Sequence, residues 1–387
     1  MSDIITKKEI FAIAADPIYI GTGGYTIGRV DNTIVRDPVT KVPKIPGSSL
    51  AGTWRYYVSL ELISKIKNYQ PEFEKIKNVS SGNEISDKEE KKSLSDKIEE
   101  YNWKNVSQEE KKEFEELKNW LKFEGNQIAK ITCAGQDNVP TAGIESPDVK
   151  TEARKTGHCG HCIVCKAFGY SKKDKSWQGM LFFSDLNILF FPVYTRFGVK
   201  WIASKRILKE AGLLDSNNNT ESQSNETIFV QEKIEDNKEN GHINLGWLNL
   251  PYIVKSLSIK LSAFKTDGFQ LSQKDIIIVS DSLISQIINS NLEVRTSVSI
   301  DPITGAAKER ALFTSEAIPR GTIFYGEIRL FDKSGFSSEN LPSESDIFCA
   351  LEDTKKYYET LGIGGMTTRG FGRMKIFFDL KDGECEK

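Results

Sequence analysis

The stretch VDNTIVRDPVTKVPKIPGSSLAG, residues 30–52, is the most informative part of this chain. Its first half alternates polar and apolar residues, which is typical of an extended segment. The prolines and glycine of KVPKIPG then form a rigid entry to a helix, which we predict to begin at Ser48 or Ser49. Apolar residues of this helix share one face, which indicates core packing. They are Leu50, Trp54, Tyr57, Val58 and Leu62.

A glycine cluster, GTGGYTIG at residues 21–28, precedes this stretch. Glycine tolerates positive φ angles and lets the backbone approach a ligand closely. Asp31 follows the cluster, with Arg29 and Arg36 on either side of it. From the spacing alone, Asp31 is either a functional carboxylate or the salt-bridged aspartate of a glycine-rich turn.

The start of the predicted helix is a candidate anion site. Unpaired N–H groups at a helix start attract anions, and Ser48 and Ser49 add two hydroxyls there. Arg55 lies one to two turns further along and can reach a phosphate. Many helices that start in this way bind nothing, so the motif alone does not decide the matter.

A second glycine-rich stretch, GIGGMTTRGFG, covers residues 362–372. A nucleotide-binding fingerprint needs a strand before its glycines and a helix after them. Here the strand-like run RMKIFFDL follows, which excludes a Rossmann or Walker loop. A glycine loop that carries Arg369 and Arg373 fits better as backbone packed against the phosphates of a nucleic acid.

The stretch HCGHCIVC, residues 158–165, predicts a metal site. Cys159, Cys162 and Cys165 form two overlapping CxxC steps, a spacing that lets thiolates converge on tetrahedral zinc. We favour Cys133 as the fourth ligand, with His158 as the alternative and His161 also possible. A structural zinc ion is the preferred interpretation. A catalytic zinc and a redox pair are the weaker ones, because catalytic zinc seldom relies on such closely spaced thiolates.

Composition limits the class of protein. Of the 387 residues 39% are hydrophobic and 27% charged, which is typical of a globular protein with a sizeable core. No apolar run is long enough to cross a bilayer, and the N-terminus lacks a secretory pattern, so a cytoplasmic protein is expected. A net charge of −2 excludes a uniformly basic surface but allows a local one.

The order of elements predicts an α+β protein rather than alternating βαβ units. Several strand-like runs are separated by a helical and zinc-binding insertion at about 65–168 and a polar loop at about 213–242. A hairpin-like excursion covers about 295–322. We expect one elaborated domain over residues 1–387.

Taken in order, five pieces of the chain resemble the RAMP superfamily of CRISPR–Cas proteins. They are residues 21–38, 41–55, 165–169 with 179–193, 294–324 and 361–378. More narrowly, they are similar to the repeated backbone subunit of type III effector complexes. The pieces SDLNILFFPV and ALFTSEAIP favour the Cmr-type (III-B), whereas DNTIVRDP also suits the Csm-type (III-A) or a III-D relative. The resemblance leaves out the two polar insertions.

The resemblance implies a modified RNA-recognition-motif (ferredoxin-like) core with inserted fingers and a thumb hairpin, matching residues 300–319. It implies copies that stack along a CRISPR RNA beside other Cas subunits. It also implies metal-dependent (Mg²⁺ or Mn²⁺) cleavage of a complementary target RNA, supported by Asp31. The RNA contacts expected on this basis are Gly23, Gly24, Arg29, Ser48, Ser49, Arg55, Arg295, Phe313, Gly364, Gly365, Arg369 and Arg373. The family usually has a basic residue where this chain has Ala51, which removes one expected contact.

Two rival functions remain at this point. The first is a scaffold that binds CRISPR RNA without nuclease activity, in a complex that acts through other subunits. The second is a free-standing zinc hydrolase, which we consider the weaker because it would need a catalytic rather than a structural cysteine cluster.

Overall fold

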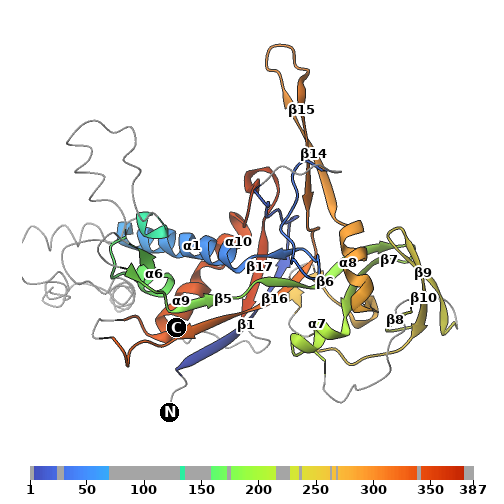
Figure 1. The fold of residues 1–387 in the computed structure, drawn as a ribbon, viewed down its shortest axis with the longest axis horizontal. Helices are drawn as coiled ribbons and strands as arrows, with labels where there is room; N and C mark the ends of the chain where they lie inside the picture. The colour runs from blue at the N-terminus through green and yellow to red at the C-terminus, as the bar shows by residue number, and fades with distance from the viewer. Residues whose placement is uncertain are drawn as a thin grey trace, which may run out of the picture.

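One mixed β-sheet organises the molecule (Figure 1). The computed structural model describes residues 4–23, 30–68, 131–135, 158–171, 176–214, 227–234, 238–261, 264–266, 269–337 and 341–378. Within these ranges eleven strands join the sheet, in the order β17-β1-β16-β6-β7-β13-β8-β10-β9 with β2 and β5 attached at its side. In the same ranges, no helix is long and apolar enough to span a membrane.

Four strands and their connecting helices form the core of the fold. They are β1 (Ile5–Ala14), β6 (Leu186–Thr195), β16 (Ile323–Phe331) and β17 (Met374–Phe378). Helix α1 (Gly47–Asn68) lies between β1 and β6, and helices α9 (Glu344–Thr354) and α10 (Lys356–Thr360) lie between β16 and β17. Neighbouring strands are antiparallel, in the order fourth, first, third, second. This is the topology of a ferredoxin-like βαββαβ unit.

The chain between β6 and β16 extends the sheet and adds a hairpin. The extension contains β7 (Gly198–Ser204), β13 (Ile276–Val279), β8 (Ile228–Val230), β10 (Leu248–Val254) and β9 (Asn240–Leu245). Helices α7 (Lys205–Glu210) and α8 (Asp281–Ser290) accompany these strands. The hairpin consists of β14 (Glu293–Ile300) and β15 (Ala307–Ala317).

The remaining elements are short. They are β2 (Lys44–Ile45), the 3-10 helix η1 (Ile131–Ala134), α6 (Ile163–Phe168), β3 (Tyr170–Ser171), β4 (Ser176–Trp177), β5 (Leu181–Phe183), β11 (Lys265–Thr266), β12 (Phe269–Gln270) and the 3-10 helices η2 (Gln273–Asp275) and η3 (Thr367–Arg369).

Aromatic residues pack on both faces of the core strands. On the helical face, Trp54 of α1 is fully buried and donates hydrogen bonds to the Leu351 carbonyl and the Thr354 hydroxyl near the end of α9. On the other face, the ring of Phe264 contacts Phe11 of β1 and Phe190 of β6 edge-on. Burial of large aromatic side chains of this kind is the main stabilising contribution in such a core.

The predicted α+β class is confirmed, and the apolar face predicted for α1 is buried. The predicted start of α1 is wrong, because Gly47 is already helical. Only Gly fits there: a side chain would meet the Phe183 carbonyl oxygen at 2.6 Å. Most of the predicted insertion at 65–168 and part of the loop at 213–242 lie outside the described residues.

Candidate functional site

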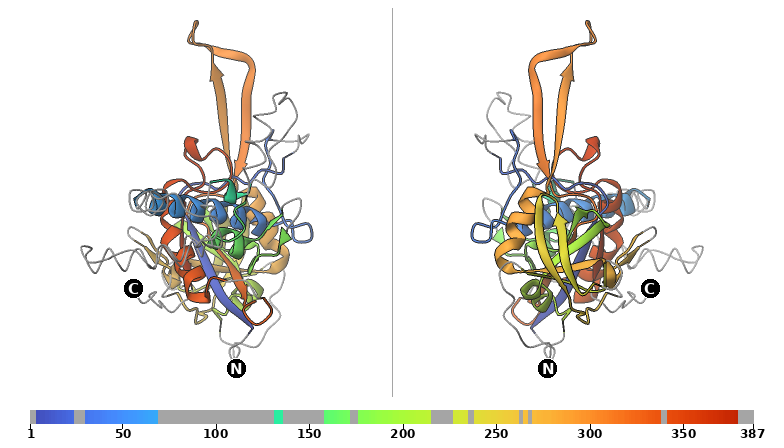
Figure 2. Two further views of the ribbon diagram at one scale, coloured as in Figure 1. Left: turned by 90° about the vertical axis from the view of Figure 1, so that its left-hand side faces the viewer. Right: turned by 90° about the vertical axis from the view of Figure 1, so that its right-hand side faces the viewer.

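The hairpin β14–β15 projects from the body of the molecule as a two-stranded arm (Figure 1), and both side views show it standing clear of the sheet (Figure 2). Its strands pair antiparallel from Glu293 opposite Ala317 outward. Several of its apolar side chains are exposed, which is unusual unless a surface binds a partner. They are Val294, Val298, Ile300, Ile303, Leu312 and Phe313.

Asp31 is fixed to the root of this hairpin. Thr314 of β15 donates two hydrogen bonds of 2.8 Å to Oδ2 of Asp31, one from its backbone N–H and one from its hydroxyl. The Asp31 amide in turn donates to the Thr314 hydroxyl at 3.0 Å. These bonds, first of all the one from the Thr314 backbone, lower the pKa of the Asp31 carboxyl. Asp31 is therefore an exposed carboxylate that stays ionised and keeps one orientation.

The segment that carries Asp31 continues the pairing of β15. The Asn32 amide donates to the Thr314 carbonyl at 3.0 Å, and the Glu316 amide donates to the Asn32 carbonyl at the same distance. Glu316 also accepts an ion pair of 2.7 Å from Arg36. The salt bridge considered for Asp31 is thus formed by Arg36 and Glu316 instead. Within the described residues, no arginine forms an ion pair with Asp31.

The other edge of the hairpin is held by the second glycine loop. Arg295 of β14 donates to the Gly370 carbonyl at 3.1 Å, and its guanidinium lies 4.7 Å from the centroid of the Phe371 ring. Arg295 also forms an ion pair of 2.5 Å with Glu293. The hairpin root therefore brings together three segments that are far apart in sequence, around residues 31, 295–314 and 370.

The glycines of the second loop serve contacts within the protein. Gly364 and Gly372 have φ angles of +82° and +91°, and a side chain on Gly364 would meet the Tyr19 carbonyl oxygen at 2.2 Å. The neighbouring Gly365 amide donates to the same Tyr19 carbonyl at 3.0 Å. Close packing within the protein, on Tyr19 for Gly364 and on Ile363 for Gly372, thus accounts for these two glycines without a ligand.

The two arginines of this loop differ. Arg373 forms a two-pronged ion pair with Asp16, at 2.5 and 3.0 Å. Arg369 is exposed, and within the described residues no carboxylate lies at ion-pair distance from it. Arg369 is therefore the more available of the two for an external phosphate.

The start of α1 already has an internal anion. The Gly47 amide donates to Oδ1 of Asp185 at 2.8 Å, and Lys44 holds the same carboxylate at 2.6 Å. Ser48 is exposed and Ser49 is half-buried just behind this contact. An RNA phosphate at this helix start would lie close to the negative charge of Asp185. The hydroxyls of Ser48 and Ser49 therefore lie beside a helix start that already binds a carboxylate.

Arg55, predicted to contact RNA, makes two hydrogen bonds within the protein. Its Nε donates to the Cys133 carbonyl at 2.9 Å, and its terminal nitrogen lies 3.1 Å from Nδ1 of His158. Because a guanidinium can only donate, Nδ1 of His158 accepts this bond. The side chain of Arg55 thus joins α1 to the segments that carry the cysteines.

The four cysteines form one buried cluster. Their sulfur atoms all lie within 4.8 Å of one another, which suits a single tetrahedral metal ion with Zn–S bonds of about 2.3 Å. Backbone amides point at the sulfurs: Cys159 N–H donates to Cys133 at 3.4 Å, and Cys162 N–H donates to Cys159 at 3.4 Å. Hydrogen bonds from the other thiols lower the pKa of Cys133, whereas burial first of all raises the pKa of Cys162.

Cys133 therefore completes the group and His158 does not. The imidazole of His158 contacts Cys165 only at 3.8 Å, and its Nδ1 lone pair is engaged by Arg55. Its ring packs on Tyr170 at 5.8 Å between centroids. His158 thus lies beside the cluster as a neighbour of the cysteines.

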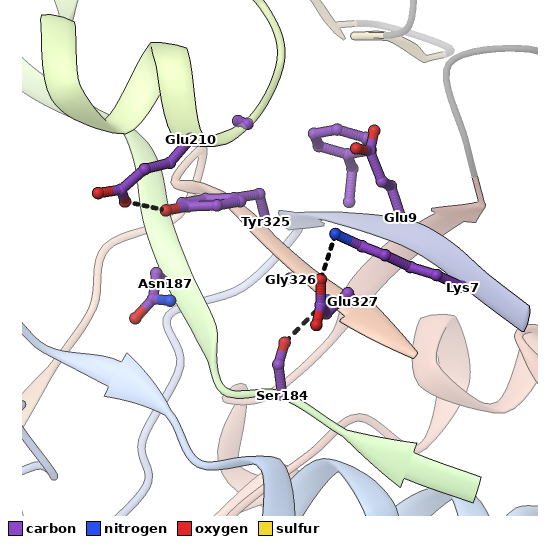
Figure 3. Close-up of a pocket in the computed structure, with 10 residues that line it drawn as sticks. Lys7, Glu9, Ser184, Asn187, Glu210, Tyr325, Gly326 and Glu327 are labelled. Carbon is purple, nitrogen blue, oxygen red and sulfur yellow. Dashed lines mark hydrogen bonds and ion pairs between the residues drawn. The ribbon is translucent and has the colours of Figure 1, made fainter. Parts of the chain in front are cut away.

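A separate cavity of about 190 Å³ lies between β1, β6, β16 and α7 (Figure 3). Its charged groups face one another: Lys7 pairs with Glu327, and the Tyr325 hydroxyl donates to Glu210 at 2.9 Å. Burial first of all, and then this contact with Glu210, raise the pKa of Tyr325. Lys7, Glu327, Tyr325 and Glu210 thus pair with one another. Among the residues that line the cavity, these pairs leave no group of side chains that points at a common ligand.

Sequence reasoning missed several residues at the hairpin root. Thr314, Glu316 and Asn289 were not singled out, although Asn289 accepts a hydrogen bond of 2.8 Å from Arg36. The β-rich pattern around ALFTSEAIP marked the strand, but no local signal marked its partner. Of the predicted residues, Gly23 has a φ of +78° with open space around it. Gly24 and Arg29 lie outside the described residues.

The chain is similar to several known proteins. The chain is 51% identical over 67 residues to the CRISPR system Cms endoribonuclease Csm3 of Methanothermobacter thermautotrophicus, which is 17% of this chain and 27% of that protein. The type III-B Cmr-beta complex in its apo state contains a chain with the same fold, at a TM-score of 0.50, 13% identity and 97% and 98% coverage. Oligomeric Cmr4 from Pyrococcus furiosus matches at a TM-score of 0.44, 14% identity and 97% and 99% coverage.

The family itself is settled by a sequence-family match. The model of the RAMP superfamily matches residues 14–375, which includes all four core strands at least in part and the whole hairpin root. The resemblance seen in the sequence is thus confirmed at this level. This chain belongs to the RAMP superfamily.

Proposed function

We propose that this protein is a CRISPR RNA-binding backbone subunit of a type III effector complex, and that it cleaves complementary target RNA through Asp31. The observation that carries the proposal is the position of Asp31, an exposed and ionised carboxylate locked to the root of a projecting hairpin. A hairpin with exposed apolar side chains suits insertion between stacked bases. A fixed carboxylate at its root would then lie beside the distorted backbone.

The chemistry suits an endonuclease that lacks a histidine pair. The chain has three histidines, and His158 is part of the cysteine-cluster environment. A carboxylate in place of histidine suits a reaction that uses a divalent cation such as Mg²⁺ or Mn²⁺, which neutralises developing phosphate charge. Asp31 would either hold that cation or orient the attacking 2′-hydroxyl group. The comparison with a relative described as an endoribonuclease supports this reaction class.

The residues proposed to contact RNA differ in their exposure and in their internal ion pairs. Arg369 and Phe313 are exposed, and Gly23 borders open space. Arg295 and Arg373 keep internal ion pairs and would need to share them with a phosphate. For Arg55 we propose a role in the cysteine cluster instead, with zinc as the metal that the four thiolates hold.

The proposed partners are the CRISPR RNA, its target RNA, further copies of this chain and other Cas subunits. The decisive experiment compares wild-type and Asp31→Ala protein in assembled complexes, with a complementary RNA and Mg²⁺ or Mn²⁺. The proposal expects loss of cleavage at regular intervals, with unchanged guide and target binding. Wild-type cleavage by the variant would instead favour the scaffold function, in which other subunits act.

A further inference from the structure

The Asp31 carboxylate and Thr314 form a closed pair across the junction between loop and hairpin. Thr314 uses both of its donors on one atom, Oδ2 of Asp31, at 2.8 Å each. Its hydroxyl oxygen also accepts from the Asp31 amide at 3.0 Å. Within the described residues, no other residue donates a hydrogen bond to the second carboxylate oxygen, Oδ1. One oxygen is therefore used for anchoring and the other is left for an external ligand.

The surrounding contacts make this pair stiff. Backbone hydrogen bonds of 3.0 Å join Asn32 to Thr314 and Glu316 on the adjacent edge of β15. The ion pair between Arg36 and Glu316 involves side chains that are only 24% and 13% exposed. These contacts hold the segment that carries Asp31 against the root of the hairpin.

From this geometry we propose that Thr314 is a positioning residue for the reaction, which holds Asp31 by Oδ2 and presents Oδ1 to the target RNA. The inference rests on the proposed cleavage by Asp31. The hydroxyl of Thr314 can be removed on its own, because the backbone N–H remains in every substitution except proline. Hydrogen bonds to a charged acceptor are stronger than neutral ones, so loss of the hydroxyl should be measurable.

The test uses complexes assembled with guide RNA, under single-turnover conditions. Thr314→Val keeps the size and branching of the side chain but removes the hydroxyl, and Thr314→Ser keeps the hydroxyl. Thr33→Val is the matched control, because the Thr33 hydroxyl lies 3.2 Å from that of Thr22 and makes no contact with Asp31. The readouts are the cleavage rate and, separately, the Kd for target RNA.

We expect Thr314→Val to slow cleavage about tenfold or more, as loss of one hydrogen bond to a charged group predicts, while the Kd stays unchanged. Thr314→Ser and Thr33→Val should cleave at close to the wild-type rate. If the valine variant does not assemble, Thr314→Ala replaces it with the same expectation.

Each other result decides against a part of the scheme. Wild-type cleavage by Thr314→Val, with Asp31→Ala inactive, would overturn the positioning role and leave the proposed function in place. Weakened target binding by Thr314→Val at an unchanged rate would also overturn it, since Thr314 would then act in binding. Wild-type cleavage by Asp31→Ala would overturn both.

Discussion

The guanidinium of Arg55 donates a hydrogen bond of 3.1 Å to Nδ1 of His158 and another of 2.9 Å to the Cys133 carbonyl. One side chain of α1 thus fastens both parts of the cysteine cluster, which come from segments separated by more than twenty residues. Arg55, which was predicted to bind a phosphate, thus forms an internal clamp between α1 and these two segments.

Arg55→Ala should therefore destabilise the protein. Loss of two partly buried hydrogen bonds, one of them to a carbonyl left without its donor, costs about 1–3 kcal/mol of unfolding free energy. Gly52→Ala on the same helix is the control, because a side chain there meets nothing within 4 Å. That change should leave stability unchanged or raise it by up to about 1 kcal/mol. Thermal or urea unfolding distinguishes the two. Equal stability of Arg55→Ala and wild type would contradict the clamp.

Metal removal should unfold the region around the cysteines. The four sulfur atoms lie within 4.8 Å of one another, and a metal bound there would link the segments that carry them, so a chelator should lower the Tm and release about one zinc ion per chain. Cys162→Ser should lose most of the metal, whereas Cys349→Ser, outside the cluster, should keep it. Elemental analysis of the purified variants measures both. Full zinc content in Cys162→Ser would remove the cluster from consideration as the metal site.

The pH dependence of cleavage should reveal the contact between Asp31 and Thr314. Hydrogen bonds from Thr314 lower the pKa of Asp31, so the carboxylate stays ionised to a lower pH than an ordinary aspartate. Removing the Thr314 hydroxyl raises that pKa. The acid limb of the pH–rate profile should therefore move to higher pH in Thr314→Val and stay in place in Thr33→Val. A limb that moves in neither variant would mean that another group governs it.

Arg369 and Arg373 should differ in RNA binding, although sequence treats them alike. Each neutralised phosphate contributes about 0.7–0.9 to the slope of log K against log salt. Arg369→Ala should reduce the slope by about one such step, because no carboxylate among the described residues forms an ion pair with it. Arg373→Ala should reduce it less, since Asp16 already pairs with Arg373. Equal slopes for the two variants and the wild type would exclude both as phosphate contacts.

The parts of the fold that follow from local pattern were predictable. The apolar residues of α1 repeat with helical spacing, and the spacing of Cys159, Cys162 and Cys165 alone indicates a shared metal ion. Pairings between distant segments were not. Asp31 and Thr314 are 283 positions apart, and Ile34 and Glu316 are 282 apart. The Thr314 hydroxyl could not be predicted to contact Asp31, because no periodicity or motif in the sequence connects the two residues.

The internal contacts of some residues could not be predicted, because the same chemistry serves two purposes. An arginine one to two turns into a helix suits a phosphate, but it equally suits a carbonyl and an imidazole, as Arg55 shows. Glycines such as Gly364 suit a nucleic acid backbone, but they equally suit the protein's own chain at Tyr19. Only the three-dimensional neighbours distinguish these cases.

The wide separation of Asp31 and Thr314 has a consequence for synthesis of the protein. A nascent chain carries Asp31 early, but the partner that orients it is made 283 residues later. Contacts of such sequence separation form late, because the chain between them must first be ordered. A chain that ends before Thr314 therefore has the aspartate without the partner that orients it.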